Sequence, residues 1–145
     1  LEIKNSKFLN SKADAIDIDS SQNVKIQNIE IKNAGNDCLD FMQTTAVVYQ
    51  SKFSSCKDKG ISIGERSNIK INKNKIDKSD IGVVSKDDSV VILTDSFILN
   101  NKLGLSAFKK NWRYGNGGKI QLKNVKFGNN DNKAKFDQYS NIDFL

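Results

Sequence analysis

The sequence predicts an all-β fold, a parallel β-helix with three short strands in each coil of about 22 residues and about six coils in all. Three observations predict it. Gly60, Gly82 and Gly104 are spaced 22 residues apart, and Cys38 lies a further 22 residues upstream. Apolar residues alternate with polar ones directly after each of these positions, and two more apolar stripes follow within each unit. Such units bury their apolar stripes only when they stack on one another.

The first strand of each unit follows a small residue in most of the units. The units start at Ala15, Cys38, Gly60, Gly82, Gly104 and, less regularly, Lys133. One and three residues later the expected buried pairs are Ile16 and Ile18, Leu39 and Phe41, Ile61 and Ile63, Val83 and Ser85, Leu105 and Ala107, and Ala134 and Phe136. This alternation is typical of a short strand with one buried face. A glycine before it indicates a sharp bend that needs a positive φ or a close backbone approach.

Two further strands complete each coil. The expected second-strand pairs are Val24 and Ile26, Val47 and Tyr49, Ile69 and Ile71, Val91 and Leu93, Ile120 and Leu122, and Ile142 and Phe144. The third stripe comprises Ile31, Phe53, Ile76, Ile98 and Phe127, with Phe53 displaced by one residue. Asn is frequent between strands because it tolerates left-handed backbone conformations. Equivalent turn residues, such as Ser67 with Ser89 and Asn74 with Ser96, are expected to hydrogen-bond between coils.

Length and pattern predict a single β-helix domain over residues 1–145, interrupted by an insertion at 108–118. Both ends of the sequence lie in mid-coil, so we expect a fragment of a longer helix, with flanking coils or caps in the parent chain. A leucine-rich repeat would require a leucine frame that "GISIGERSN" lacks. Alternating helices and strands would require helical periodicity, which is missing.

Composition limits the partners and the chemistry. The net charge of +6 favours an anionic partner. The alternative is that the abundance of Lys and Asn, with no Pro or His, only reflects an AT-rich coding sequence. No stretch approaches the roughly 20 apolar residues of a membrane span, so none is expected. Cys38 and Cys56 lack the paired spacing of a metal or redox site, and we expect no disulfide, with Cys38 acting as a small buried side chain.

The G-I-x-I units and the second I-x-I of each coil resemble the right-handed parallel β-helix superfamily, typified by pectate lyases and by carbohydrate-binding and sugar-hydrolase repeats. The segments "DCLDF", "DKGISIGERS", "SKDDS" and "LSAFKKN" are also similar to β-helix regions of bacterial envelope proteins. The resemblance implies a right-handed coil, an extracellular or cell-envelope location, and an acidic polysaccharide as partner, often with calcium. No catalytic motif of the superfamily matches this sequence residue by residue, which leaves the chemistry open.

Acidic residues should gather on the first strands of the first two full coils. They are Asp14, Asp17, Asp19, Asp37 and Asp40. Carboxylates in close proximity favour a cation, so these residues form a candidate calcium site of hard oxygen ligands. The alternative is a solvated acidic strand with Lys59 as a neighbour.

The turns after the first strands carry candidate catalytic residues. Superposition of the coils places Glu65, Asp87 and Lys109 in one stack, with Arg66, Asp88 and Lys110 beside it. In β-elimination of a uronate, a cation neutralises the carboxylate and a basic side chain removes the C5 proton. Lys59, Lys86 and Arg66 are the candidate bases, and Glu65 is the nearby carboxylate. The alternative is a set of ordinary surface ion pairs, worth about 0 to 1 kcal/mol each.

The insertion "FKKNWRYGNGG", residues 108–118, lengthens one turn, and inserted loops on repeat scaffolds usually lie on the binding face. Its candidate binding residues are Lys109, Lys110, Trp112, Arg113 and Tyr114. Aromatic rings stack on sugar rings, and Lys or Arg pairs with carboxylate or sulfate. The alternative is a lid whose Trp packs on the coil.

These observations predict a domain that binds an anionic polysaccharide and that, as an enzyme, would cleave or epimerise it. The competing hypothesis is a non-catalytic structural or surface-interaction module. Nucleic acid is disfavoured as a partner because acidic residues are interleaved with lysines on every coil.

Overall fold

The chain winds into a parallel β-helix of nineteen strands in three sheets, and the computed structural model describes all residues 1–145. Sheet A is formed by β1 (Glu2–Lys4), β4 (Val24–Gln27), β7 (Thr45–Tyr49), β10 (Asn68–Asn72), β13 (Val90–Thr94), β16 (Lys119–Lys123) and β19 (Asn141–Phe144). Sheet B is formed by β2 (Lys7–Leu9), β5 (Glu30–Lys32), β8 (Lys52–Ser54), β11 (Lys75–Asp77), β14 (Phe97–Leu99) and β17 (Lys126–Gly128). Sheet C is formed by β3 (Ile16–Asp19), β6 (Leu39–Met42), β9 (Lys59–Gly64), β12 (Ile81–Lys86), β15 (Leu103–Phe108) and β18 (Asn132–Phe136).

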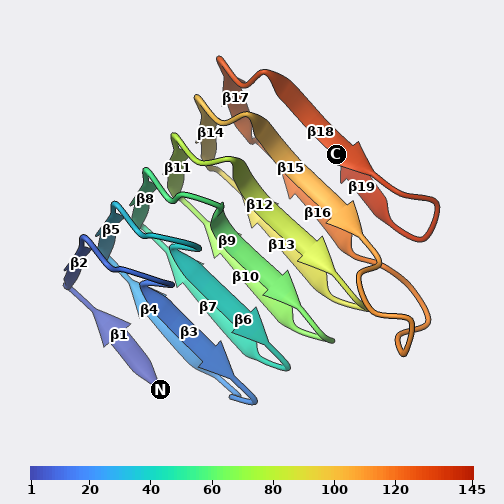
Figure 1. Cartoon of the computed structure of the whole chain (residues 1–145), viewed down its shortest axis with the longest axis horizontal. Helices are drawn as coiled ribbons and strands as arrows, with labels where there is room; N and C mark the ends of the chain where they lie inside the picture. The colour runs from blue at the N-terminus through green and yellow to red at the C-terminus, as the bar shows by residue number, and fades with distance from the viewer.

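The coils stack from the N-terminus to the C-terminus, as Figure 1 shows by the progression from blue to red. Each complete coil passes through sheet C, then sheet A, then sheet B, and all neighbouring strands pair in parallel. We name the connections between sheets the C–A, A–B and B–C turns. The predicted all-β solenoid is therefore confirmed. The structure contains no helix of the length and apolar character needed to cross a lipid bilayer.

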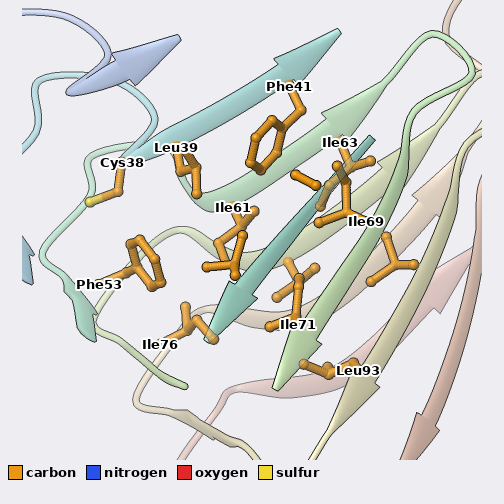
Figure 2. Close-up of a cluster of buried hydrophobic side chains, with 14 of the residues drawn as sticks. Cys38, Leu39, Phe41, Phe53, Ile61, Ile63, Ile69, Ile71, Ile76 and Leu93 are labelled. Carbon is orange, nitrogen blue, oxygen red and sulfur yellow. The ribbon is translucent and has the colours of Figure 1, made fainter. Parts of the chain in front are cut away.

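The interior is one continuous core of 28 buried residues, formed by the inward side chains of the three sheets. Ile61 pairs with Leu39 and Val83 on sheet C, and Ile76 pairs with Phe53 and Ile98 on sheet B. Figure 2 shows Leu39, Ile61, Phe53 and Ile76 pointing into the interior between the strands. The 2-residue alternation of the sequence therefore corresponds to buried and exposed faces.

The expected second-strand pair of the second full coil, Val47 and Tyr49, is wrong by one residue. Ala46 and Val48 point inward instead, and Ala46 pairs with Val24 and Ile69, whereas Val47 is 37% exposed. A C–A turn one residue shorter than in the preceding coil shifts the strand. Because side chains alternate with period 2, that single residue exchanges the inner and outer faces.

The repeated glycines are explained by close backbone approach, because none of them has a positive φ. A Cβ added to Gly60 would lie 2.6 Å from the carbonyl oxygen of Gly82, and one added to Gly82 would lie 2.5 Å from that of Gly104. At Gly60 and Gly82, the neighbouring coil therefore lies too close for a side chain.

The left-handed backbone expected at the turns belongs to non-glycine residues. Asn5, Asn28 and Asn124 in the A–B turns have φ of 51°, 51° and 55°, and they lie in the same column as Lys73 and Asp95. Side chains of the turns also connect the coils, as predicted: the backbone N–H of Ser67 donates to Ser89 Oγ at 3.1 Å, and the backbone N–H of Asn74 donates to Ser96 Oγ at 3.1 Å.

Cys38 and Cys56 form a disulfide, so the expectation of two reduced cysteines is wrong. Their Cα atoms are 5.3 Å apart although 18 residues separate them in the chain. Cys56 lies in the B–C turn that leads toward β9, and Cys38 lies one coil earlier, directly before β6. The two positions become neighbours only when consecutive coils stack, which is why spacing rules for isolated motifs do not reveal the pair.

Candidate functional site

A pocket of about 420 Å³ lies on the C–A side of the coil, beneath the inserted loop 108–118. Its lining residues are Glu65, Lys86, Asp87, Lys110, Asn111 and Trp112. Figure 1 shows the loop between β15 and β16 extending past the shorter turns of the preceding coils. The pocket thus joins two catalytic candidates, Glu65 and Lys86, with two binding candidates, Lys110 and Trp112.

Lys86 is half-buried at the end of β12, on the outer face of sheet C. Its Nζ donates to Ser62 Oγ at 3.1 Å. Gly64 of the preceding coil leaves room for the side chain, because a Cβ there would lie 2.6 Å from Lys86 Cε. Burial lowers the pKa of the Lys86 amine; Asp40 opposes this shift and Lys110 adds to it. A lowered pKa makes Lys86 the candidate best suited to accept a proton.

Two adjacent aspartates hold the inserted loop. Asp87 is 1% exposed, and its Oδ1 accepts the backbone N–H groups of Lys110 at 2.7 Å and Asn111 at 2.8 Å. Asp88 Oδ1 accepts the N–H of Asn116 at 2.7 Å, and its Oδ2 accepts that of Gly115 at 3.2 Å. Both halves of the loop are therefore fixed to the same C–A turn.

The charge of Asp88 matches this anchoring role. Partial burial acts to raise its pKa, but the hydrogen bonds from Asn116 and Gly115 outweigh burial and lower it. Sequence reasoning placed Asp87 and Asp88 in a stack of surface charges and missed their role. The available signal was an Asp-Asp turn one coil before an insertion, since Asp can accept the free N–H groups of a loop.

Tyr114 and Arg66 also fasten the loop to the coil. Tyr114 is only 9% exposed, and its hydroxyl donates to Glu65 Oε2 at 3.3 Å. The guanidinium carbon of Arg66 lies 5.3 Å from the centre of the Tyr114 ring, and Arg66 Nε lies 3.8 Å from Asp88 Oδ2. Burial, followed by the Glu65 carboxylate, raises the pKa of Tyr114.

Trp112 is 86% exposed and does not pack against the coil as a lid would. Arg113 is exposed next to it, with its backbone N–H and its Nε directed at Asn111 Oδ1, and it does not line the pocket. Lys109 points away toward the C-terminal coil, with Nζ 5.0 Å from the centre of the Tyr139 ring. The loop therefore presents one free indole ring beside one exposed lysine, Lys110.

Lys59 lies outside the pocket, in an ion-pair network. Its Nζ contacts the carboxylates of Asp58 and Asp37. Burial acts to lower the pKa of Lys59, but these two carboxylates outweigh burial and raise it. A raised pKa keeps the amine protonated, which leaves Lys86 as the stronger candidate base.

The acidic residues of the first coils lie on β3 and β6 and in the turns directly before these strands, and they do not form a cluster that could hold a metal ion. Asp17 and Asp40 are opposite each other on β3 and β6, and burial, followed by Asp19 and Asp40, raises the pKa of Asp17. Asp14 Oδ1 accepts the Asn36 amide at 2.7 Å and the Asp37 N–H at 2.8 Å.

No group of three or more His, Cys, Asp or Glu side chains is arranged to hold a metal ion. Calcium binding by Asp14, Asp17, Asp37 and Asp40 therefore stays a prediction of the sequence.

Comparison with known proteins gives one match. The family model described as "Right handed beta helix region" matches residues 1–144. No curated protein and no solved structure matches the chain. The match covers all nineteen strands and the inserted loop.

Proposed function

Because the chain belongs to the right-handed β-helix family, whose coils leave the turns free for recognition, we propose that it binds an acidic polysaccharide in the pocket beneath Trp112. One observation carries this proposal. The pocket places an exposed indole ring beside two lysines, Lys86 and Lys110, that have no carboxylate within ion-pair distance. A sugar ring stacks on the indole while the lysines pair with its carboxylate.

The disulfide supports a location of the protein outside the cytoplasm. Disulfides persist mainly in oxidising environments such as the cell surface. The Cys38–Cys56 bridge lies among buried residues and joins two coils. We therefore propose an extracellular or cell-envelope location, where acidic polysaccharides are also found.

Binding is tested by calorimetric titration of the protein with oligogalacturonate. We expect Trp112→Ala and Lys110→Gln each to weaken binding about 10-fold, which corresponds to about 1.4 kcal/mol. Tyr139→Ala and Lys135→Gln are the matched controls, because both side chains are exposed and lie outside the pocket. Unchanged affinity in both pocket variants would show that the loop is not part of the binding site. If the unmodified protein binds no acidic glycan, the alternative of a non-catalytic structural module is favoured.

A second candidate function is β-elimination of the bound polyuronate, and the lowered pKa of Lys86 favours it. The neutral amine of Lys86 would take the C5 proton while Lys110 neutralises the uronate carboxylate. The electrons of the C5–H bond would form the C4–C5 double bond, and the C4–O4 bond would break, with the leaving oxygen protonated by solvent. Epimerisation would share the first step and return the proton to the opposite face.

Absorbance of the unsaturated uronate product tests this second function. We expect activity to disappear in Lys86→Met, while binding in the titration weakens by about 10-fold at most, as in Lys110→Gln. Activity that survives in Lys86→Met, or a protein that binds without ever producing the absorbance, would restrict the function to binding.

A further inference from the structure

Charge is distributed unevenly around the coil. Sheets A and B, together with the A–B turns between them, carry eleven lysines and five carboxylates, a difference of +6. The lysines are Lys4, Lys7, Lys25, Lys32, Lys52, Lys70, Lys73, Lys75, Lys119, Lys123 and Lys126, and the acids are Glu2, Glu30, Asp77, Asp95 and Asp143. This difference equals the net charge of the whole chain, so the remainder, which includes sheet C and the inserted loop, is neutral. The excess positive charge of the chain thus lies on sheets A and B and on the turns between them.

A groove of about 460 Å³ lies at the A–B corner in the middle of this positive surface. Its lining residues are Gln50, Ser51, Lys52, Lys73, Asn74, Lys75, Asp95 and Phe97. All three lysines are exposed, and none has a carboxylate within ion-pair distance. Unpaired ammonium groups that lie close together repel one another, and an anionic ligand would relieve that repulsion.

The one carboxylate of the groove is occupied. Asp95 Oδ2 accepts the amide of Asn72 at 3.1 Å, and its Oδ1 accepts the amide of Asn124 at 2.6 Å. Asp95 therefore binds the turns of the adjacent coils rather than a lysine of the groove. The lysines remain free for an external anion.

An exposed aromatic ring extends the groove along the coil axis. Phe97 is 44% exposed, and its backbone pairs with Lys75 on one side and Lys126 on the other. Lys126 Nζ lies 5.7 Å from the centre of the Phe97 ring. The outward row Lys52, Lys75, Phe97, Lys126 thus occupies four consecutive coils, and adjacent strands in a sheet are about 4.8 Å apart.

We propose that this A–B groove is a second binding site for an acidic polysaccharide, which would lie parallel to the coil axis. A coil-to-coil step is close to the length of one sugar residue in an extended chain, so successive carboxylates or sulfates would meet successive lysines. A sugar ring would cover Phe97, and the exposed amide of Gln50 would hydrogen-bond its hydroxyl groups. The site shares its ligand class with the pocket beneath Trp112 but none of its residues, so either site can exist without the other.

The test is calorimetric titration of variant proteins with a heparin-derived hexasaccharide and with oligogalacturonate at two salt concentrations. The groove variant combines Lys52→Gln, Lys73→Gln and Lys75→Gln. The control variant, with Lys12→Gln, Lys57→Gln and Lys135→Gln, removes the same charge from exposed positions outside sheets A and B and the A–B turns. We expect the groove variant to lose at least 10-fold in affinity for one of the two glycans and the control variant to lose no more than 2-fold.

Further variants separate this site from bulk electrostatics and from the pocket. Phe97→Ala is expected to weaken glycan binding 3- to 10-fold, whereas Leu9→Ala, which removes another exposed apolar side chain of sheet B, is expected to change it less than 2-fold. Equal losses in the groove and control variants would overturn the proposal. Loss of all binding in Trp112→Ala, with the groove variant unchanged, would leave the pocket as the binding site and also overturn it.

The last arm addresses the competing polyanion. Single-stranded oligonucleotide of the same charge is titrated into the same proteins, because exposed aromatic rings and lysines also bind single strands. Tighter binding of the oligonucleotide than of either glycan would overturn the proposal in favour of nucleic acid. Thermal unfolding of every variant should match that of the unmodified protein, since every substituted side chain is exposed.

Discussion

The repeating coils and the inserted loop 108–118 are held in place by different kinds of contact. In the coils, each buried side chain packs on the equivalent side chain of the coils above and below, as Phe53 does on Ile31 and Ile76. The loop buries only Tyr114 among its large side chains and depends on the carboxylates of Asp87 and Asp88. Packing therefore holds the coils in place, whereas a few hydrogen bonds to charged groups hold the inserted loop, which we propose binds the ligand.

The largest expected effect concerns the core of the coils. Phe53→Ala should lower the free energy of unfolding by about 3 to 5 kcal/mol, because it leaves a cavity among fully buried neighbours. Chemical denaturation measures it. Trp112→Ala is the control in the loop, and it should change stability by less than about 0.5 kcal/mol, as an exposed substitution does. Similar losses in the two variants would erase the distinction between coils and loop.

The disulfide should have the next largest effect on the coils. Reduction, or replacement of Cys38 and Cys56 by Ala, should cost about 3 kcal/mol, because the bridge closes a loop of 18 residues in the unfolded chain. Thermal unfolding with and without reductant measures the change. A protein whose transition is the same in both conditions would show that stacking alone aligns these two coils.

The anchoring of the loop should be separable from the stability of the coils. Asp87→Ala removes the acceptor for two backbone N–H groups and should weaken local protection of the loop by about 1.5 to 3 kcal/mol. Amide hydrogen exchange of residues 108–118 measures this, with exchange of strands β7 and β10 as the internal reference. Asp131→Ala, an exposed residue in a B–C turn, is the control. Equal deprotection of loop and strands would mean that the loop is an integral part of the core.

Acid should affect the two regions in opposite directions. Asp137 Oδ2 accepts the N–H of Lys109, at the start of the loop, at 2.8 Å. Hydrogen bonds outweigh burial and lower the pKa of Asp88 and Asp137 in the folded protein, so the stability they contribute is present above their unfolded pKa of about 3.9 and is lost below it. Burial raises the pKa of Asp17 and Asp37 in the folded protein, so their ionised forms destabilise it. As the pH falls through these raised pKa values, which lie above the unfolded value of about 3.9, protonation removes the destabilisation.

Hydrogen exchange at a series of pH values, corrected for intrinsic rates, checks this difference. The loop should lose protection only below about pH 4, whereas protection of β3 and β6 should hold or increase between pH 7 and pH 4. Loss of protection in the loop already at pH 5 or 6 would contradict the assigned role of the aspartates.

The smallest expected effect is a gain. Lys78 has a φ of 56° in a B–C turn whose equivalent positions are Asn10, Asn33, Asn100 and Asn129 in four other coils and Ser55 in a fifth. Because Asn tolerates the left-handed conformation better than Lys, Lys78→Asn should raise the free energy of unfolding by about 0.5 to 1 kcal/mol. Lys57→Asn, in the B–C turn of the preceding coil and with no positive φ, should give no gain. A gain of equal size in both variants would show that loss of positive charge is the cause.

The sequence predicted the fold well because stacked coils repeat their contacts, so the spacing of Gly60, Gly82 and Gly104 reports three-dimensional neighbours directly. It failed where one residue changes the outcome, since a C–A turn shorter by one residue exchanged Val47 for Ala46 and Val48. It also failed for contacts between turns of unequal length. The Cys38–Cys56 bridge joins residues that are 18 apart in the sequence, and the hydrogen bonds from the loop to Asp87 join residues that are 23 and 24 apart. None of these separations equals the 22-residue spacing of the glycines.

For the candidate site, the loop and Lys86 could be proposed from the sequence. The sequence did not show which loop residues hold the loop to the coil and which ones are exposed to a ligand. Trp112 and Tyr114 are two residues apart, yet one is 86% exposed and the other is 9% exposed. Tyr114 is buried because its side chain contacts Glu65 and Arg66, which lie 49 and 48 residues earlier in the sequence. Such a choice is made by packing of the folded loop and leaves no local pattern.

The most direct measurement is amide hydrogen exchange of the protein with and without saturating oligogalacturonate. Binding beneath the inserted loop should increase protection at residues 110–114 and at Lys86 on ligand addition, and the same experiment with Trp112→Ala should show little change there. Protection that rises only in strands remote from the pocket, or that is identical with and without ligand, would contradict binding beneath the inserted loop.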